Sequence, residues 1–292
     1  MKRRALLAAP ILGSLVATST QAFATPTTPQ DITARLAELE KQYGGRLGVA
    51  ILDTQTHRRV LYKANERFMM CSTFKLLLVG ATLARVDHGE EQLNRRIIIT
   101  PQELITYAPL TSPHVGPPGM TIAALCAAAI TASDGVAANC LLKAMGGPAA
   151  LTAYIRQLGD KITRSDRYEP EMNRPTPDHL QDTTTPLAML KDLDILACGN
   201  ALTPQSRALL LTWLEACTTG LDLVRAGLPA SWRVGDKTGH GNGATNDVVI
   251  VWPPHRAPLL ISVYYQSVST NDDMRPADMF AEIGRLAVSQ TL

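Results

Sequence analysis

The first candidate for chemistry is a serine, Ser72, that is followed three residues later by a lysine, Lys75. The apolar residues that follow predict a helix over 72–86. Positions i and i+3 lie on one face of a helix, so the Lys75 side chain can reach the Ser72 hydroxyl. A serine hydroxyl is a weak nucleophile near neutral pH and needs an adjacent base. The pair predicts an activated nucleophile; taken alone, it is also compatible with a serine helix cap beside a solvated lysine.

Three further stretches carry residue types that acyl transfer uses. Ser133-Asp134-Gly135 separates two predicted helices, and Lys237-Thr238-Gly239 ends a predicted strand. Between them, a long loop contains Glu169 and, four residues later, Asn173. A second hydroxyl, a second lysine and a carboxylate can donate or accept protons around a nucleophile. Together with Ser72 and Lys75, these stretches predict a catalytic site.

The hydrophobic pattern that must position them has strands at both ends of the chain and helices in the middle. Long connections over 109–119 and 161–185 interrupt the helices, and loops of such length inside a domain are often functional. The pattern predicts helices over 31–43, 72–86, 121–132, 135–145, 149–158, 186–196, 204–217 and 276–288, and strands over 47–52, 58–62, 232–237, 248–252 and 259–265. The expected fold class is α/β (an α+β sandwich): an antiparallel sheet of about five strands built from both termini, flanked by helices, with an inserted all-helical domain.

The N-terminus has the pattern of a secretory signal peptide. Lys2, Arg3 and Arg4 precede an uncharged apolar run over 5–16, and the segment ends in Ala22-Phe23-Ala24. We expect cleavage near Ala24 and a periplasmic or secreted protein. No later stretch approaches the roughly 18 apolar residues of a membrane span. The expected domains are the signal peptide over 1–24, a discontinuous α/β domain over 25–66 and 218–292, and a helical domain over 67–217.

Charge and composition limit the partners. The chain has 28 Lys and Arg against 26 Asp and Glu, and removal of residues 1–24 leaves 25 against 26. A near-neutral chain is a poor ligand for nucleic acid. The histidines and the cysteines show no metal-ligand spacing, so neither a metal nor another cofactor is expected. We expect a monomer that binds a small molecule. The cysteines are Cys71, Cys126, Cys140, Cys198 and Cys217.

The four ordered motifs resemble those of the class A β-lactamases, within the superfamily of penicillin-recognising serine enzymes. That family has Ser-x-x-Lys, Ser-Asp-x, a Glu-x-x-x-Asn loop and Lys-Thr-Gly in this order, and several of these motifs are shared with penicillin-binding proteins. The resemblance covers nearly all of the chain after residue 24. It implies hydrolysis of penicillins and cephalosporins through an acyl-enzyme, with a possible extension of spectrum, and hence antibiotic resistance.

The resemblance also implies a role for each residue of the site. Ser72 is the nucleophile, and Ser133, supported by Lys75 and Lys237, passes a proton to the leaving nitrogen. The backbone N–H groups of Ser72 and His240 form the oxyanion hole. The resemblance also implies that Lys237 and Thr238 bind the substrate carboxylate and that Glu169 and Asn173 hold the deacylating water. It further implies that Asn139 is a brace for Glu169 and that Tyr107 lies at the mouth of the site.

Glu169 is the better base for deacylation on energetic grounds. A glutamate with an ordinary pKa near 4.3 is already ionised at neutral pH. A neutral Lys75 would require its pKa to fall by about three units, which is roughly 4 kcal/mol. The base for acylation, Lys75 or Glu169, stays open. The resemblance further pairs Arg167 with Asp182 and Arg164 with Asp166 in the loop that carries Glu169.

The sequence departs from the family at several positions. Gly135 replaces the usual asparagine, so an amide that contacts the substrate is missing. The usual carboxylate-binding arginine is absent, because Leu223 and Thr245 occupy its two usual positions; Arg225 and Arg275 are the candidates to replace it. Some relatives have disulfides from Cys71 to a residue near 241 and from Cys126 to a residue at position 79. Gly241 and Val79 stand there, so we expect neither bridge.

Two other functions are compatible with part of the pattern. A D,D-peptidase or penicillin-binding protein shares the serine and lysine motifs, but Glu169 and Asn173 argue against it. A non-catalytic β-lactam sensor domain would need a membrane anchor or a signalling segment, and the sequence shows no such segment.

Overall fold

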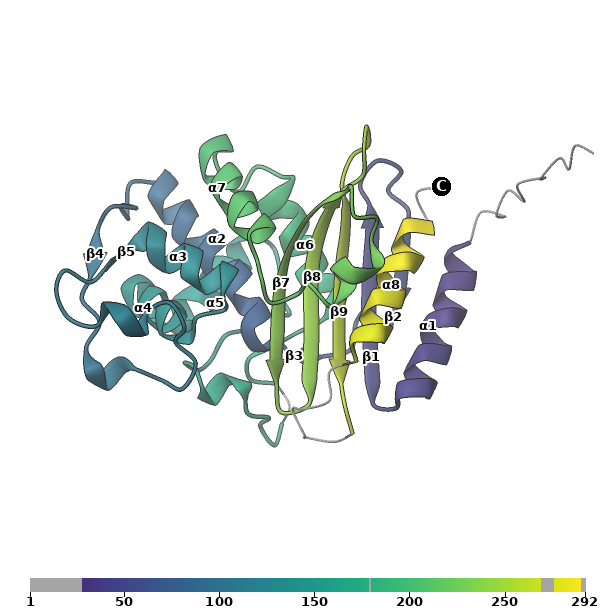
Figure 1. The fold of residues 1–292 in the computed structure, drawn as a ribbon, viewed down its shortest axis with the longest axis horizontal. Helices are drawn as coiled ribbons and strands as arrows, with labels where there is room; N and C mark the ends of the chain where they lie inside the picture. The colour runs from purple at the N-terminus through teal and green to yellow at the C-terminus, as the bar shows by residue number, and fades with distance from the viewer. Residues whose placement is uncertain (1–27, 179, 269–275, 290–292) are drawn as a thin grey trace, which may run out of the picture.

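The structure, a computed structural model, describes residues 28–178, 180–268 and 276–289, and the predicted signal peptide lies outside this range. A five-stranded antiparallel sheet with strand order β2-β1-β9-β8-β7 lies at its centre (Figure 1). Its first part is β1 (Arg46–Asp53) and β2 (Arg59–Tyr62), and its second part is β7 (Arg233–Gly241), β8 (Ala244–Trp252) and β9 (Leu259–Gln266). β1 pairs with β9 from Arg46 opposite Gln266 to Asp53 opposite Leu259. The prediction of one sheet built from both ends of the chain is confirmed.

One face of the sheet is covered by α1 (Pro29–Tyr43) and α8 (Ala277–Ser289), which lie side by side in Figure 1. Ile32 and Leu36 of α1 and Phe280 and Ile283 of α8 are fully buried against strand residues such as Val49. Apolar residues recur at helical spacing in both helices, so each presents one apolar stripe to the sheet. This layer forms its own hydrophobic core.

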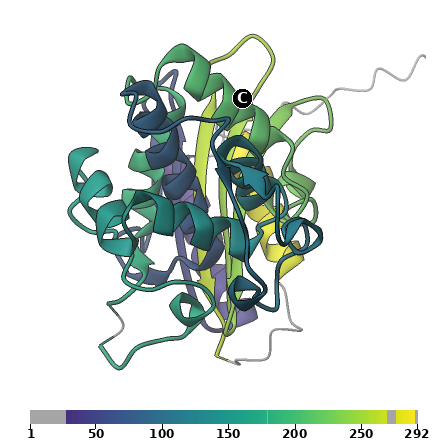
Figure 2. The ribbon, with the colours of Figure 1, turned by 90° about the vertical axis from the view of Figure 1, so that its left-hand side faces the viewer.

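The other face carries the helices of the middle of the chain, as the sequence predicts (Figure 2). Residues 74–84 are all buried, because the helix that contains them is packed among the other helices of this layer. A helix surrounded in this way is apolar on all sides. The helices are α2 (Phe74–Asp87), α3 (Ile122–Thr131), α4 (Gly135–Met145), α5 (Pro148–Gln157), α6 (Pro186–Ala197) and α7 (Pro204–Glu215).

The structure differs from the prediction at short elements and at some boundaries. β7 and β8 extend further than predicted, to a tight turn between Gly241 and Ala244. The prediction stopped short because the buried polar residues of this hairpin hide the apolar alternation. Two pairs of two-residue strands were not predicted, since two residues carry no periodicity. They are β3 (Phe68–Met69) with β6 (Thr183–Thr184), and β4 (Arg96–Ile97) with β5 (Met120–Thr121). Over the ranges given above, no helix is both long and apolar enough to cross a bilayer.

Candidate active site

Ser72 lies in a 3₁₀ turn, Cys71–Thr73, and not within the helix that the sequence predicts from residue 72, because α2 begins only at Phe74. Lys75, in the first turn of α2, has a fully buried side chain, and its Nζ donates to Ser72 Oγ at 2.9 Å. Cys71 has φ 45, a left-handed conformation that costs a non-glycine residue about 1 kcal/mol or more. The predicted proximity of hydroxyl and amine is therefore present, in a turn that tertiary packing holds in an unfavourable conformation.

Ser133 lies between two buried lysines. Its Oγ accepts hydrogen bonds from Lys237 Nζ at 3.1 Å and from Lys75 Nζ at 3.3 Å. The serine follows α3, and Asp134 caps α4 by accepting a hydrogen bond from the Ala137 N–H at 2.9 Å. Burial, with a contribution from the charge of Lys75, lowers the pKa of Lys237 to about 8. The arrangement places a hydroxyl within hydrogen-bond reach of two proton donors.

Glu169 completes this cluster from the loop over 161–185. Its side chain is 6% exposed, and Oε1 lies 2.7 Å from Lys75 Nζ and 3.5 Å from Ser72 Oγ. Asn139 of α4 holds its backbone, because Asn139 Nδ2 donates to the Glu169 carbonyl at 2.8 Å and the Glu169 N–H donates to Asn139 Oδ1 at 3.0 Å. Asn139 thus contacts Glu169 as expected, and a contact with substrate stays a prediction.

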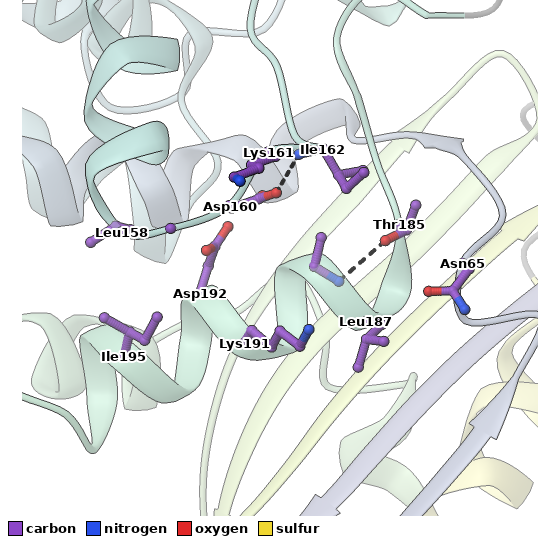
Figure 3. A pocket seen from close by; sticks show the side chains of 12 residues that line it. Asn65, Leu158, Asp160, Lys161, Ile162, Thr185, Leu187, Lys191, Asp192 and Ile195 are labelled. Atoms are coloured by element: carbon purple, nitrogen blue, oxygen red, sulfur yellow. Dashed lines mark hydrogen bonds between the residues drawn. The ribbon is translucent and has the colours of Figure 1, made fainter.

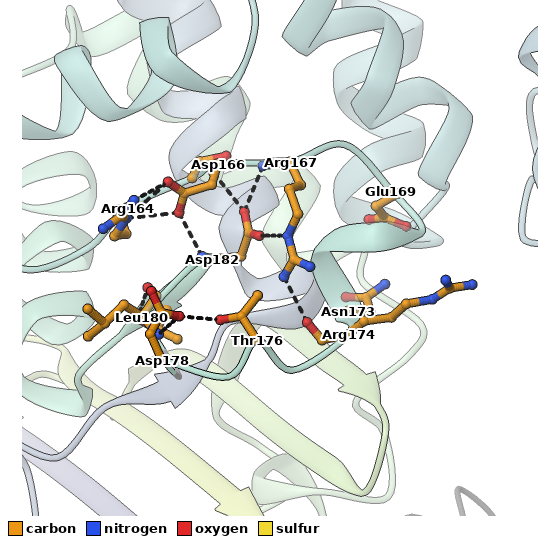
Figure 4. A network of polar contacts seen from close by, with 12 residues as sticks. Arg164, Asp166, Arg167, Glu169, Asn173, Arg174, Thr176, Asp178, Leu180 and Asp182 are labelled. Atoms are coloured by element: carbon orange, nitrogen blue, oxygen red, sulfur yellow. Dashed lines mark hydrogen bonds and ion pairs between the residues drawn. The ribbon is translucent and has the colours of Figure 1, made fainter.

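The loop that carries Glu169 is closed at its neck by one ion pair, and a second ion pair lies inside the loop (Figure 4). Arg167 Nε lies 2.6 Å from Asp182 Oδ2, and Arg164 Nη2 lies 2.5 Å from Asp166 Oδ1. Both pairs were predicted. Asp182 is fully buried, and its Oδ1 also accepts the N–H groups of Asp166 and Arg167 at 2.7 and 3.1 Å. The loop is therefore fixed at both of its ends.

Gly135 leaves room for the Glu169 carboxylate. A Cβ atom at position 135 would lie 2.7 Å from Glu169 Oε2 and 2.6 Å from Ile105 Cδ1, closer than such atoms approach. The space that the family's asparagine would enter is thus filled by Glu169 and Ile105. Both contacting atoms are the far ends of flexible side chains, so this packing does not by itself explain the glycine.

The strand β7 brings the Lys237-Thr238-Gly239-His240 segment beside the turn that contains Ser72. A Cβ atom at Gly239 would lie 2.6 Å from the Met70 carbonyl oxygen, so glycine permits this close approach of two backbones. Asn246 Nδ2 of β8 donates to the same carbonyl at 3.1 Å and holds the turn against the sheet. This arrangement places Ser72 and His240 on adjacent segments, and the oxyanion hole stays a prediction.

A cavity of about 540 Å³ opens above these groups. Seven of the predicted residues line it: Ser72, Tyr107, Ser133, Glu169, Asn173, Thr238 and His240. Tyr107 lies at the rim of the cavity and is 53% exposed. Lys75 and Lys237 are buried beneath the cavity floor and contact Ser133 from there. The sequence prediction missed one wall of the cavity, which is formed by Thr218, Thr219, Leu221 and Asp222. In the sequence these residues belong to an irregular segment between a predicted helix and a predicted strand, which does not indicate a binding site.

The candidate Arg225 is not available to a substrate carboxylate in this cavity. Its guanidinium forms an ion pair with the fully buried Asp236 and does not line the cavity. The other candidate, Arg275, lies outside the described residues. None of the five cysteines forms a disulfide, and Cys71 Sγ lies 3.9 Å from the Gly241 carbonyl oxygen. No group of three or more metal-ligating side chains occurs among the residues that the structure describes.

The fold and this cluster define a serine hydrolase of mixed α/β architecture. A profile of the β-lactamase enzyme family matches residues 31–291. The β-lactamase OXY-1 of Klebsiella oxytoca is 46% identical over 80% of both chains, and CTX-M-25 of Escherichia coli is 44% identical over 88% of both. A structure of the last common ancestor of Gram-negative class A β-lactamases is 54% identical, with a TM-score of 0.85 over 89% of this chain and 99% of that one.

The putative class A β-lactamase PenP from Rhodopseudomonas palustris is 48% identical, with a TM-score of 0.84, and the alignment covers 89% of this chain and 99% of that chain. The chain belongs to the class A β-lactamases.

Proposed function

We propose that this β-lactamase hydrolyses penicillins and cephalosporins through an acyl-enzyme on Ser72. The observation that carries the proposal is the position of Glu169 Oε1, 2.7 Å from Lys75 Nζ and 3.5 Å from Ser72 Oγ. A nucleophile, a buried amine and a buried carboxylate within hydrogen-bond reach are the groups that a two-step acyl transfer needs.

In the first step, Ser72 Oγ attacks the lactam carbonyl carbon, and the C–N bond breaks. Its proton passes to Lys75 or Glu169, and the leaving nitrogen takes a proton from Ser133 Oγ, which two lysines contact. The N–H groups of Ser72 and His240 stabilise the oxyanion, and each such donor contributes about 3 kcal/mol in comparable sites. Lys237 and Thr238 bind the substrate carboxylate through a charge-assisted contact.

In the second step, Glu169 removes a proton from water, which attacks the ester and releases Ser72. Asn173 lies four residues after Glu169 on the same cavity wall and orients this water. The strong fixation of the loop neck supports this role, because a general base must stay within hydrogen-bond reach of the water. We further propose that the enzyme is an exported monomer with an α/β domain and a helical domain, and that it confers β-lactam resistance.

The test is the substitution Glu169→Gln. We expect this variant to acylate with a penicillin but to accumulate the covalent intermediate, which mass spectrometry detects as the enzyme plus one substrate. Steady-state turnover should fall by at least about a hundredfold, the lower range for loss of a general base. Glu171→Gln is the matched control, because Glu171 is an exposed glutamate two residues along the same loop.

Rapid turnover by the Glu169→Gln variant would exclude Glu169 as the base. A single stoichiometric burst by the unmodified enzyme with a chromogenic cephalosporin, without steady hydrolysis, would instead indicate a penicillin-binding protein.

A further inference from the structure

A separate cavity of about 250 Å³ lies where the end of the loop over 161–185 meets one end of the sheet. Arg46 at the start of β1 and Gln266 at the end of β9 line it from the sheet, and Pro175 and Thr183 line it from the loop. It shares no lining residue with the cavity above Ser72. Its volume lies just below the range of sites for drug-sized molecules, so it suits a small ligand.

Arg67, which directly precedes β3, lines this cavity with a guanidinium that has few partners. Its Nη1 donates to Thr183 Oγ1 at 2.9 Å, and over the described residues this is the single hydrogen bond of its side chain. No described carboxylate forms an ion pair with it. The side-chain amide of Gln181, also on the cavity wall, has no hydrogen-bond partner in the described part of the chain. Because a guanidinium has five N–H donors in a rigid fork, most of those of Arg67 remain for a ligand or for water.

The acids around Arg67 have partners of their own. Glu66 forms an ion pair with Arg46 Nη2 at 3.0 Å and does not line the cavity. Asp160, whose charge also acts on Arg67, accepts the Ile162 N–H at 2.6 Å, as Figure 3 shows. None of the described residues that line the cavity is acidic. The cavity wall therefore carries two arginines and no negatively charged side chain.

The surroundings of Arg67 have an excess of positive charge. Burial lowers the pKa of the Arg67 guanidinium, and the charges of Arg164 and Arg156 lower it further. Asp160 opposes this effect but does not cancel it. A guanidinium nevertheless stays charged throughout the physiological pH range. Arg67 is thus a partly buried cation that a bound anion would stabilise.

The rest of the cavity wall is largely apolar and includes Phe68, Met69 and Pro175. The Arg46 guanidinium lies over the Phe68 ring, 4.7 Å from its centroid, so the second cation is stacked on an aromatic face. An inorganic anion would leave these apolar surfaces in contact with water, whereas an organic body would cover them. The wall therefore favours an anion that carries an apolar group.

We propose that this cavity binds a small organic monocarboxylate, a carboxylate group on a single aromatic ring. The Arg67 fork matches the two carboxylate oxygens in bidentate geometry, and the Gln181 amide can donate to the same group. The ring packs against Phe68 and Pro175. The proposal concerns a site separate from Ser72 and does not rest on the proposed function.

The site joins the sheet to the loop that carries Glu169. Asn242 lines the cavity, and its Nδ2 donates to the Asn173 carbonyl oxygen in that loop. Gln266 Nε2 of β9 donates in turn to the Asn242 carbonyl oxygen at 2.9 Å. The Arg67 partner Thr183 lies in β6, near the end of the same loop. A ligand in this cavity contacts both the loop and the sheet, so its binding should stabilise the folded protein.

The experiment is isothermal titration calorimetry of the full chain with benzoate at pH 7, in a buffer that contains neither carboxylate nor phosphate. We expect one saturable site, and a melting temperature that rises with the benzoate concentration. Arg67→Gln should weaken binding by about tenfold or more, as expected for loss of a hydrogen bond to a charged group. The control Arg59→Gln removes the same charge from an exposed arginine of β2 that does not line the cavity.

Two further ligands separate the charge from the ring. Benzyl alcohol keeps the ring without the charge, and phosphate keeps the charge without the ring, so both should bind at least about tenfold more weakly than benzoate. Arg67→Lys keeps the charge but loses the planar fork, so its affinity for benzoate should lie between those of the unmodified protein and Arg67→Gln. Circular dichroism checks that both variants are folded.

No saturable binding of benzoate, or equal binding of benzyl alcohol, would overturn the proposal. Equal binding of phosphate would also overturn it, because the site would then accept anions in general. Benzoate binding that Arg67→Gln leaves unchanged would place the ligand elsewhere, such as in the cavity above Ser72. β-Lactam turnover by the unmodified enzyme, measured in parallel, tests the Ser72 site separately, so failure of one proposal is distinguishable from failure of the other.

Discussion

Lys237 is a fully buried lysine whose Nζ donates to Ser133 Oγ at 3.1 Å. Burial lowers its pKa from 10.5 to about 8, so its charge is present below pH 8 and is lost above it. The contact with a substrate carboxylate needs this charge. We expect kcat/KM for a penicillin to fall roughly tenfold between pH 8 and pH 9.5, following the protonated fraction of the free enzyme.

The substitution Lys237→Arg tests the assignment of this alkaline limb. A guanidinium stays charged throughout the range, so the decline should move to higher pH even if the absolute activity is lower. Steady-state kinetics from pH 6 to pH 10 on both proteins provides the comparison. If activity declines at the same pH in both proteins, a group other than Lys237 causes the decline.

At the scale of single residues, the sequence predicted contacts that follow from local geometry. Ser72 and Lys75 are one turn apart, so their proximity could be predicted from spacing alone. Glu169 could be placed with them only through the order of the motifs, because about a hundred residues separate it from Ser72. The close packing of Gly135 against Glu169 and Ile105 could not be predicted, since tertiary structure determines which side chains enter the space at a glycine.

At the scale of elements, the neck of the loop over 161–185 links stability to activity. Asp182 is buried and accepts two backbone N–H groups and the Arg167 side chain. We expect Asp182→Ala to leave these donors unsatisfied and to lower the free energy of unfolding by about 3 kcal/mol. The deacylation rate should fall as well, because Glu169 is then less well positioned.

Urea denaturation and single-turnover kinetics of the acyl-enzyme measure these two effects. Asp178→Ala is the control, since Asp178 is an exposed acid in the same loop that forms only local hydrogen bonds. Unchanged deacylation in a destabilised Asp182→Ala protein would show that the neck stabilises the fold without positioning Glu169.

Sequence periodicity predicts the long helices of this protein but not its two-residue strands. Long helices such as α6 and α7 were predicted nearly to the residue, because an apolar stripe repeats over several turns. The pair β3 and β6 was not predicted, although it joins the start of the helical segment to the end of the Glu169 loop. Its two-residue strands form because tertiary contacts bring them together, and such contacts have no local signature.

At the scale of the whole molecule, one sheet separates two hydrophobic cores. Val49 and Ile51 of β1 face the core under α1 and α8, while Ala50 and Leu52 face the core under the middle helices. Successive side chains of a strand point to opposite faces, so β1 contributes to both cores at once. Loss of either core should therefore destabilise the sheet on which the other depends.

Leu36→Ala tests this coupling. Leu36 of α1 is fully buried in the core on the face away from Ser72, and truncation should lower the free energy of unfolding by about 3 kcal/mol. Well below the melting temperature, kcat and KM should stay unchanged. On heating, activity and helical circular dichroism should be lost in one transition, at a lower temperature than in the unmodified protein. The control Leu61→Ala, at a leucine that is 41% exposed, should change stability by less than about 0.5 kcal/mol. Activity that survived a first unfolding transition of the Leu36→Ala protein would mean that the two cores unfold independently, and that the β1 strand does not couple them.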